Sequence, residues 1–375
     1  MKSLQLFPIL LLSTFLLGDS YAAKKKLSPE LEDLFQGPLL DSKGKEVSKN
    51  VLAGKTIGLY FSAHWCPPCR GFTPKLVEFR DSNKKDFEVV FVSSDRSPKA
   101  HMDYMSGSKM KWYTMPHGSD AANALKKKYE VPGIGGQRGY VSFGKESAKG
   151  RKEGDLKEFW HFGQYVENNT ELELEYPKNV LVDELPAFNE VGKKTYRMLE
   201  KTAKYVLRSL AIHLGLEETY FDQYIHNGNS ILRPIHYPPI TKTPEKAVRA
   251  AAHGDINLIT LLMGAQGRGL QVQNHNGDWI DAIAEADELM INVGDMLSRH
   301  TNNKLKSTIH RVVNPPKELW GNSRYSIPFF MHPISAMKLD VLDSCVDENN
   351  PKQFENITAG EFLNQRLEEL GLTKS

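Results

Sequence analysis

Residues 252–260 read AHGDINLIT, and the interpretation of the C-terminal two-thirds of the chain depends on this stretch. Its apolar residues predict a β-strand, in which residues two positions apart project from the same face. His253 and Asp255 would therefore direct an imidazole and a carboxylate to one point. A third donor is available from residues 307–312, STIHRV, where His310 lies on a later predicted strand. We therefore expect these three side chains to form a metal site.

Two histidines and one carboxylate on one side of a metal ion leave its remaining positions open to other ligands. This donor set is typical of oxygen-activating iron(II), whereas either histidine alone would more often be an ordinary core or surface residue. Residues 324–326, RYS, strengthen the prediction, because a guanidinium and a hydroxyl on one strand face can bind a carboxylate. The alternative for Arg324 is a surface ion pair, which would not require Ser326 two positions later.

The residues around these motifs predict a mainly-β domain with supporting helices, because many short strands at close spacing are typical of a sandwich or barrel. Residues 274–278, NHNGD, separate two β-prone segments and indicate a hairpin. The predicted strands are Gly269–Gln273, Trp279–Ala282, Glu288–Val293, Lys306–Val313 and Tyr325–Met331. The predicted helices are Leu185–Leu214, with Val191, Tyr196, Leu199, Ala203, Val206 and Leu210 on one face and a stop at Gly215, then Glu217–Tyr224 and Thr358–Leu372.

This part of the chain resembles the isopenicillin N synthase-like branch of the iron(II)- and 2-oxoglutarate-dependent oxygenases. The matching motifs begin with residues 137–144 (QRGYVSFG) and 155–163 (DLKEFWHFG). Further matches are residues 232–239, 253–262, 269–280, 292–313 and 324–330. The resemblance implies an oxygenase domain over residues 135–375, built on a distorted double-stranded β-helix (jelly-roll) core at about 231–335.

The resemblance also implies roles for single residues and for cofactors. It makes His253, Asp255 and His310 the ligands of Fe(II). It makes Arg324 and Ser326 the clamp for the far carboxylate of the cosubstrate 2-oxoglutarate, helped by Tyr237. The implied activity is oxidation of a small organic substrate by O2 (hydroxylation, desaturation or cyclisation), with ascorbate as a candidate reductant.

Two alternatives to this activity stay open at the level of the sequence. In isopenicillin N synthase itself, the equivalent arginine and serine hold the substrate's carboxylate and no oxo acid is used. The motif around Arg324 fits both uses. A jelly roll can also be a binding domain without catalysis, and that reading predicts no stoichiometric iron.

The N-terminal third has a different pattern. The apolar runs 56–62 (TIGLYFS) and 87–93 (FEVVFVS) alternate with predicted helices at 67–82, 98–106 and 120–129, which indicates a parallel sheet flanked by helices. Residues 65–69, WCPPC, lie between the first strand and the first helix. A helix N-terminus stabilises a thiolate, so Cys66 is the expected nucleophile and Cys69 the resolving thiol. Half of a zinc site is the alternative, but the chain has only three cysteines and no second pair.

Residues 59–79 (LYFSAHWCPPCRGFTPKLVEF) and 110–116 (MKWYTMP) resemble the tryparedoxin and nucleoredoxin branch of the thioredoxin superfamily. The resemblance implies a thioredoxin-like module over residues 24–134 that acts on a dithiol or disulfide protein partner. That family continues with V-x-G-I-P, including a cis-proline, where this chain reads VPGIG at 131–135, so we expect an incomplete module fused to the oxygenase. A thiol–disulfide oxidoreductase with the jelly roll as a binding scaffold is the alternative function.

The composition limits the classes of partner, and the N-terminal residues indicate the cellular compartment. The chain of 375 residues can hold two or three cores, and its formal charge of +2 argues against a nucleic-acid-binding surface. Lys2, the apolar run 4–17 and the small residues Ser20, Ala22 and Ala23 follow the order of a secretory signal peptide over residues 1–23. We therefore expect a secreted or periplasmic protein without a membrane anchor after cleavage, or a cytoplasmic protein if the signal does not function.

Overall fold

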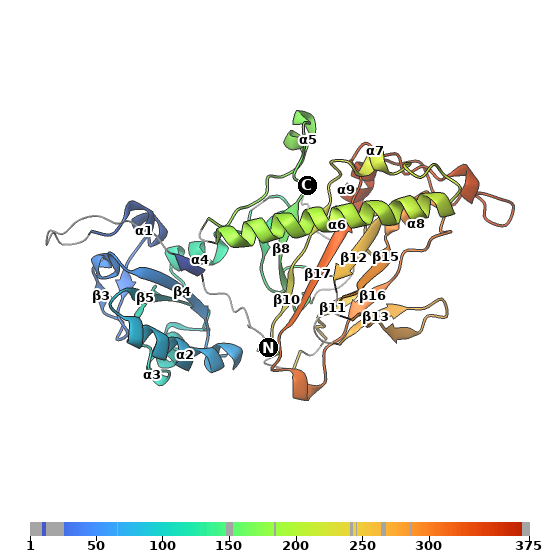
Figure 1. The fold of residues 1–375 in the computed structure, drawn as a ribbon. Helices are drawn as coiled ribbons and strands as arrows, with labels where there is room; N and C mark the ends of the chain where they lie inside the picture. Colours follow the sequence, from blue (N-terminus) through green and yellow to red (C-terminus); the bar gives the residue numbers. More distant parts are fainter. Residues whose placement is uncertain are drawn as a thin grey trace. The chain divides into compact units, whose positions relative to one another are not determined.

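The structure is a computed structural model. It describes residues 10–12, 26–65, 67–131, 133–147, 153–183, 185–240, 243–244, 246–263, 268–285 and 287–369. The chain folds into two compact units, whose elements are drawn in Figure 1. Unit 1 comprises Met1–Tyr129 and Val182–Ala187, and unit 2 comprises Glu130–Leu181 and Phe188–Ser375. The expected signal peptide lies outside the described residues except for residues 10–12.

Unit 1 contains a six-stranded sheet with the order β1-β4-β5-β6-β2-β3. Its strands are β1 Leu10–Leu12, β2 Leu39–Leu40, β3 Glu46–Val47, β4 Thr56–Ser62, β5 Phe87–Ser93 and β6 Tyr113–Thr114. β4 and β5 have the predicted bounds and run parallel, from Thr56 opposite Phe87 to Ser62 opposite Ser93. β5 is also parallel to β6. The prediction of a parallel α/β core is therefore confirmed.

Helices cover both faces of this sheet, because alternate residues of β5 are buried in different clusters. Val90 and Val92 pack in one cluster, and Val89 and Phe91 pack in the other. The helices of unit 1 are α1 Pro29–Leu34, α2 Pro67–Asn83, α3 Pro98–Gly107 and α4 Asp120–Lys127, with the 3-10 turn η1 Lys49–Leu52. The continuous apolar runs of β4 and β5 follow from this burial on both sides.

Unit 2 is built on two antiparallel sheets that form the predicted jelly-roll core. The larger sheet has the order β10-β8-β9-β17-β12-β15, with β7 paired to β8, and the smaller sheet has the order β11-β16-β13-β14. The strands are β7 Gly139–Val141, β8 Glu158–Gly163, β9 Ile231–Leu232, β10 Ile235–Tyr237, β11 Ala250–His253, β12 Ile259–Met263, β13 Leu270–Gln273, β14 Trp279–Asp281, β15 Leu289–Val293, β16 His310–Val312 and β17 Arg324–Met331. β13 and β14 form the predicted hairpin, with Gly277 in the left-handed region at φ 87°.

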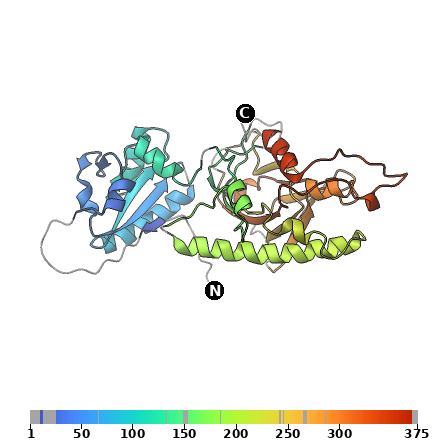
Figure 2. The ribbon, with the colours of Figure 1, turned by 90° about the horizontal axis from the view of Figure 1, so that it is seen from above.

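The long helix α6, Pro186–His213, lies along the outer face of the larger sheet (Figures 1 and 2). Tyr196, Ala203 and Leu207 of the helix share one hydrophobic cluster with Leu261 and Phe329 of the sheet. The predicted amphipathic helix is thus confirmed. One assignment within it is wrong, because Val191 is 63% exposed. It lies five residues before Tyr196, which turns its side chain well away from the buried stripe.

The remaining elements of unit 2 are α5 Thr170–Glu175, α7 Asp222–Ile225, α8 Asp295–His300, η2 Lys317–Leu319, η3 Asp343–Cys345 and α9 Ala359–Glu369. Two predicted bounds need correction. The helix expected from Glu217 begins only at Asp222, because the preceding residues form separate turns. The strand expected from Lys306 is restricted to His310–Val312, because these are the residues that pair with β11 and β13.

The interior of unit 2 lies between its two sheets. Leu262 of β12 and Met290 of β15 are register partners, and both pack with Leu270 and Val312 of the smaller sheet. Thr260 and Asn292 form the next register pair on the same face, because side chains of a strand alternate in direction. The apolar interior therefore ends at Thr260 and Asn292, which contact the candidate metal site described below.

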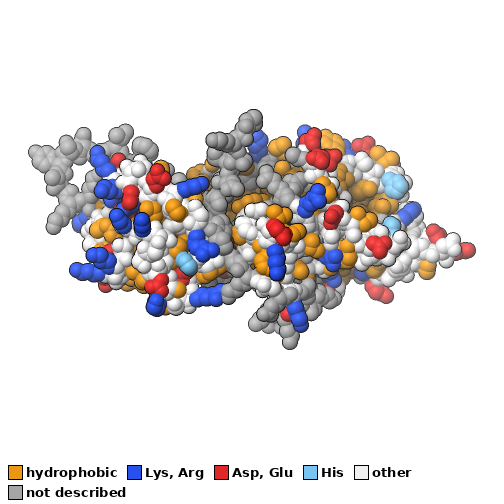
Figure 3. Space-filling model, turned by 90° about the horizontal axis from the view of Figure 1, so that it is seen from below, with side chains coloured by type: hydrophobic (Ala, Val, Ile, Leu, Met, Phe, Trp, Pro, Cys, Tyr) orange, Lys and Arg blue, Asp and Glu red, His pale blue; other side chains and the backbone are white. Residues whose placement is uncertain are grey.

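The charges on the surface agree with the near-neutral composition. Figure 3 shows both signs of charge spread among apolar side chains on the face that it draws. Within the described part of the chain, no helix is both long and apolar enough to cross a membrane.

Candidate metal centre

The three predicted metal-binding residues come from two neighbouring strands and the turn that follows one of them. His253 is the last residue of β11 and pairs in register with His310, the first residue of β16. Their ring centroids are 4.5 Å apart. Asp255 lies two residues beyond β11, and its Oδ1 is 3.8 Å from Nε2 of His310. One ligand atom from each residue lies within 4.8 Å of the others, so the structure brings the three side chains together.

The predicted strand over residues 252–260 is wrong, because β11 ends at His253 and β12 begins at Ile259. The intervening turn is fixed by hydrogen bonds within it and from Asp295. The backbone N–H of Asp295 donates to the carbonyl of Asp255 (2.7 Å). The buried side-chain amide of Asn257 donates to the carbonyl of Ile259 (2.8 Å), as asparagine often does where it replaces strand pairing. Asp255 therefore reaches the site from a turn and not from the strand face of His253.

Each imidazole is oriented by its second ring nitrogen. Nδ1 of His253 donates to the carbonyl of Ala251 (2.7 Å), and Nδ1 of His310 donates to the carbonyl of Thr308 (3.1 Å). These bonds leave Nε2 of each ring as the metal-binding atom. Burial, followed by the neighbouring His310 and Lys157, lowers the pKa of His253 to about 4. The imidazole is therefore neutral near pH 7, as a metal ligand must be.

The carboxylate of Asp255 is held by two polar residues that were not predicted from the sequence. Thr260 Oγ1 and Asn292 Nδ2 both donate to Oδ2, at 2.7 Å and 2.9 Å. Burial raises the pKa of Asp255, but His310, His253 and these two hydrogen bonds outweigh it, and the pKa is lowered. The only sequence signal for Thr260 and Asn292 was a single polar residue within each apolar strand.

The donor set fits iron(II) on its chemistry. Two imidazoles and one carboxylate are the protein ligands that leave open positions for O2 and a chelating cosubstrate. Among the residues that the structure describes, no further histidine, cysteine or acidic side chain joins this group, so the four protein ligands of a structural zinc site are not assembled.

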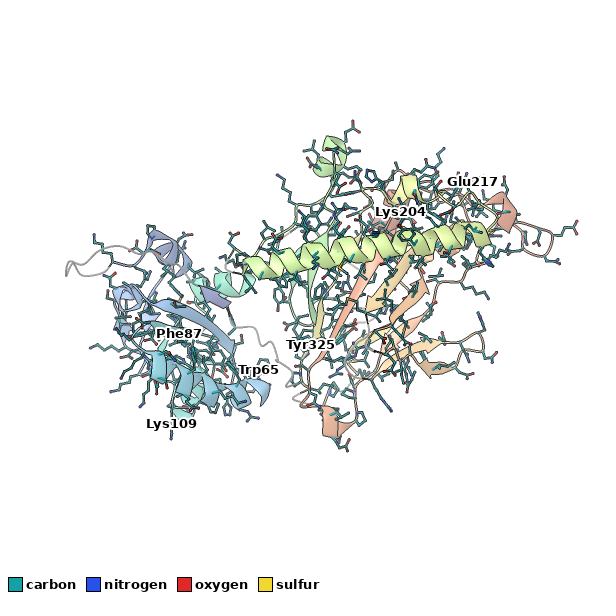
Figure 4. All side chains as sticks on the ribbon, viewed as in Figure 1. Trp65, Phe87, Lys109, Lys204, Glu217 and Tyr325 are labelled. Carbon is teal, nitrogen blue, oxygen red and sulfur yellow. The ribbon has the colours of Figure 1, made fainter. Side chains whose placement is uncertain are left out.

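The predicted carboxylate clamp lies on two adjacent strands of the larger sheet. Tyr237 of β10 is the register partner of Arg324 of β17, and Ile235 is the partner of Ser326. Tyr237, Arg324 and Ser326 therefore share one face, and all three are buried. The guanidinium carbon of Arg324 lies 5.0 Å from the ring centroid of Tyr237. Tyr325, which Figure 4 labels on β17, points to the opposite face and is 44% exposed.

Part of the hydrogen-bonding capacity of the Arg324 guanidinium is unused among the described residues. Its Nε and Nη1 are buried and have no hydrogen-bond partner among the described residues. Burial lowers the pKa of Arg324, and the contact with Tyr237 opposes this only in part. A surface ion pair is ruled out, because only 2% of the residue is exposed. A buried guanidinium with two unpartnered nitrogens is costly, and this supports a carboxylate-binding role.

A network of charged side chains adjoins His253 and was not predicted from the sequence. Lys157 Nζ is 2.9 Å from Asp155 Oδ2 and 3.4 Å from Glu146 Oε1, and Arg233 Nη1 is 3.3 Å from Glu146 Oε2. Burial raises the pKa of Glu146, but Arg233 and Lys157 outweigh it, and the pKa is lowered. Asp155 Oδ1 accepts a hydrogen bond from the backbone N–H of Ala251 (3.1 Å), so the network fixes β11 just before its metal ligand.

In unit 1, Cys69 lies in the first turn of α2. Its carbonyl accepts hydrogen bonds from Thr73 Oγ1 (2.7 Å) and the hydroxyl of Tyr60 (3.2 Å). Trp65, labelled in Figure 4, is 45% exposed, and its Nε1 donates to the carbonyl of Ser94 (2.9 Å). Cys66 lies outside the described residues, so its pairing with Cys69 stays a prediction.

Comparison with known proteins supports both halves of this description. Residues 228–333 match the family model of the 2OG-Fe(II) oxygenase superfamily, and residues 54–135 match a model described as thioredoxin-like. A crystal structure from Caulobacter crescentus, assigned to the 2OG-Fe(II) oxygenase family, is 46% identical with a TM-score of 0.59. That match covers 65% of this chain and 79% of the other. The chain therefore belongs to the 2OG-Fe(II) oxygenase superfamily.

Two curated relatives match different parts of the chain. A 2-oxoglutarate-Fe(II) type oxidoreductase from Emericella nidulans is 32% identical over 185 residues, which are 48% of this chain and 52% of the relative. Nucleoredoxin from Homo sapiens is 40% identical over 106 residues, which are 27% of this chain and 24% of nucleoredoxin. The chain spans about half the length of the oxidoreductases it matches. It thus joins a thioredoxin-like domain to an oxygenase domain.

Proposed function

We propose that the protein is an iron(II)- and 2-oxoglutarate-dependent oxygenase that oxidises a small organic substrate with O2. One observation carries the proposal: the same unit holds the triad of His253, Asp255 and His310 and a buried Arg324 with no partner for Nε and Nη1. A purely structural metal site would account for the triad but not for this guanidinium. The motif order from QRGYVSFG at 137–144 to RYS at 324–326 supports the isopenicillin N synthase-like branch.

Two groups of residues have separate roles: one would bind the metal, and the other would bind the cosubstrate. His253, Asp255 and His310 would hold the iron, which when bound supplies the activation of O2. Thr260 and Asn292 orient the Asp255 carboxylate through their hydrogen bonds to Oδ2. The clamp of Arg324, Ser326 and Tyr237 would bind the far carboxylate of the oxo acid and so fix the direction from which its other end approaches the metal. Burial of these groups keeps water from competing with the charged contacts.

The test is 2-oxoglutarate-dependent formation of succinate by the purified full-length protein. The protein is loaded with iron(II) without oxygen and is then given 2-oxoglutarate, ascorbate and air. We expect succinate formation that is lost in His310→Ala and strongly reduced in Arg324→Met. Bound iron without 2-oxoglutarate turnover would instead favour a substrate carboxylate at Arg324, and a protein without stoichiometric iron would leave only a binding domain.

A second activity is favoured by the exposed Trp65 and the placement of Cys69 in the first turn of α2. We infer that unit 1 exchanges disulfides with a dithiol or disulfide protein partner through Cys66 and Cys69. The variants Cys66→Ala and His310→Ala separate the two activities. Loss of disulfide reduction with retained succinate formation in Cys66→Ala would make unit 1 an accessory domain, whereas loss of neither activity would remove the redox role.

We further propose export through the predicted signal at residues 1–23, which is supported by the order of Lys2, the apolar run and the small residues. Expression in an export-competent bacterium should yield a secreted or periplasmic protein whose N-terminus, read by mass spectrometry, lies close to Lys24. A protein that keeps Met1 in the cytoplasm would contradict this.

A further inference from the structure

A second arginine lies at the predicted carboxylate clamp. Arg249 stands immediately before β11 and is 4% exposed. Its guanidinium carbon is 6.0 Å from the ring centroid of Tyr237, and that of Arg324 is 5.0 Å from the same centroid. Two guanidinium groups therefore share one aromatic side chain in the interior of unit 2.

Among the residues that the structure describes, no acidic side chain neutralises either guanidinium. Nη2 of Arg249 donates to the carbonyl of Asn322 (3.0 Å), while its Nε is buried without a partner. Within the described ranges no carboxylate pairs with Arg249 or with Arg324. Burial, and next the charge of Arg324, lowers the pKa of Arg249 to about 10. The two cations thus oppose each other, and an anion bound between them would relieve both the repulsion and the unmet hydrogen bonding.

An unpartnered Nε alone would not distinguish Arg249 from an ordinary buried arginine. Arg299 also has a buried, unpartnered Nε and lies against aromatic rings, those of Phe354 and Phe362. Arg249 differs because a second guanidinium lacking its full set of partners lies on the same ring. Asn322, which holds Arg249, also stands two residues before Arg324, so the start of β17 positions both groups.

We propose that Arg249 is a second guanidinium of the clamp and binds the far carboxylate of the oxo acid together with Arg324 and Tyr237. A carboxylate has enough lone pairs to accept hydrogen bonds from two guanidiniums and a hydroxyl at once. The proposal rests on the proposed function, because it assumes that the anion at Arg324 is the distal end of 2-oxoglutarate. Arg249 is then a binding residue that selects oxo acids carrying a second carboxylate.

The test compares two oxo acids of equal chain length. 2-Oxoglutarate and 2-oxovalerate share the metal-chelating end, but 2-oxovalerate has a methyl group in place of the far carboxylate. Dissociation constants are measured by titration calorimetry on the full-length, iron(II)-loaded protein without oxygen. For Arg249→Met we expect 2-oxoglutarate to bind about 10- to 100-fold more weakly, as for loss of charge-assisted hydrogen bonds, with 2-oxovalerate changed less than about two-fold.

Matched variants make the outcome decisive. Arg299→Met removes a guanidinium of similar surroundings and should leave both dissociation constants unchanged. Arg249→Lys keeps the charge, so it guards against misfolding of Arg249→Met and should still weaken 2-oxoglutarate selectively. Equal weakening of both acids, or no weakening, would overturn the role of Arg249. If the wild type does not prefer 2-oxoglutarate to 2-oxovalerate, the proposed function itself fails; if only Arg324→Met loses the preference, the inference on Arg249 alone fails.

Discussion

Replacing Thr260 with valine should weaken iron binding without changing any metal ligand. Thr260 Oγ1 donates to Asp255 Oδ2 at 2.7 Å and accepts a hydrogen bond from Asn257 Nδ2 at 3.0 Å. Valine has nearly the same shape but removes the hydroxyl. A hydrogen bond to an ionised group contributes about 1.5–3 kcal/mol, which corresponds to about 10- to 150-fold in an equilibrium constant. Since Asn292 still holds Oδ2 at 2.9 Å, we expect the lower end, a loss of about 10-fold in iron affinity.

The assay is anaerobic competition for iron(II) between the protein and a chromophoric chelator. The matched control is Thr202→Val, because Thr202 is an exposed residue of α6 whose hydroxyl bonds to the carbonyl of Met198 in its own helix (3.0 Å). The control should bind iron as the wild type does. If Thr260→Val melts at the wild-type temperature and binds iron equally well, then the hydroxyl of Thr260 does not support the carboxylate of Asp255 as a metal ligand.

Three further predictions follow from the same unit. Gly294→Ala should destabilise the protein by about 2–3 kcal/mol in urea unfolding, because a Cβ would lie 2.2 Å from the carbonyl oxygen of Asn257, whereas Gly321→Ala meets nothing within 4 Å and should be neutral. The lowered pKa of Glu146 means that its carboxylate stabilises the fold at pH 7 and begins to lose this effect as the pH falls through the ordinary value of 4.5. The difference in unfolding free energy between wild type and Glu146→Gln should therefore shrink by about 1 kcal/mol from pH 7 to pH 4, and a constant difference would contradict this. Removing metal with a chelator should lower the melting temperature of the wild type but not of His310→Ala, because a metal that binds only the folded state stabilises it by mass action.

His253 and Asp255 could be singled out from the sequence because they form a local H-x-D motif, and His310 because the family resemblance includes its segment. The backbone that carries Asp255 could not be predicted. Its turn depends on contacts with Gly294 and Asp295, which are distant in the sequence. No pattern within residues 252–260 predicts these contacts. Thr260 and Asn292 depend on the register between β12 and β15 in the same way. Residues that act through tertiary pairing were therefore missed, although their polarity within apolar strands was visible.

The strands differ in the same way: those with a local sequence pattern were predicted, and those that depend on tertiary pairing were not. β4 and β5 were predicted to the residue because strands buried on both faces are continuous apolar runs. β8, Glu158–Gly163, was not predicted because it lies in a stretch rich in glycine and charge, which is not typical of a strand. Its strand conformation depends on pairing with β10, which is distant in the sequence. The pairing of Tyr237 with Arg324 was suggested by resemblance alone. The place of Arg249 beside them required the folded chain.

The most direct measurement is an oxygen-free crystal structure of the full chain with iron(II) and 2-oxoglutarate. We predict one iron bound by Nε2 of His253, Nε2 of His310 and a carboxylate oxygen of Asp255, with the far carboxylate of 2-oxoglutarate on Arg324. An iron site elsewhere, or an oxo acid whose far carboxylate leaves Arg324 unpaired, would contradict the assignment of this unit as an iron(II)- and 2-oxoglutarate-dependent oxygenase.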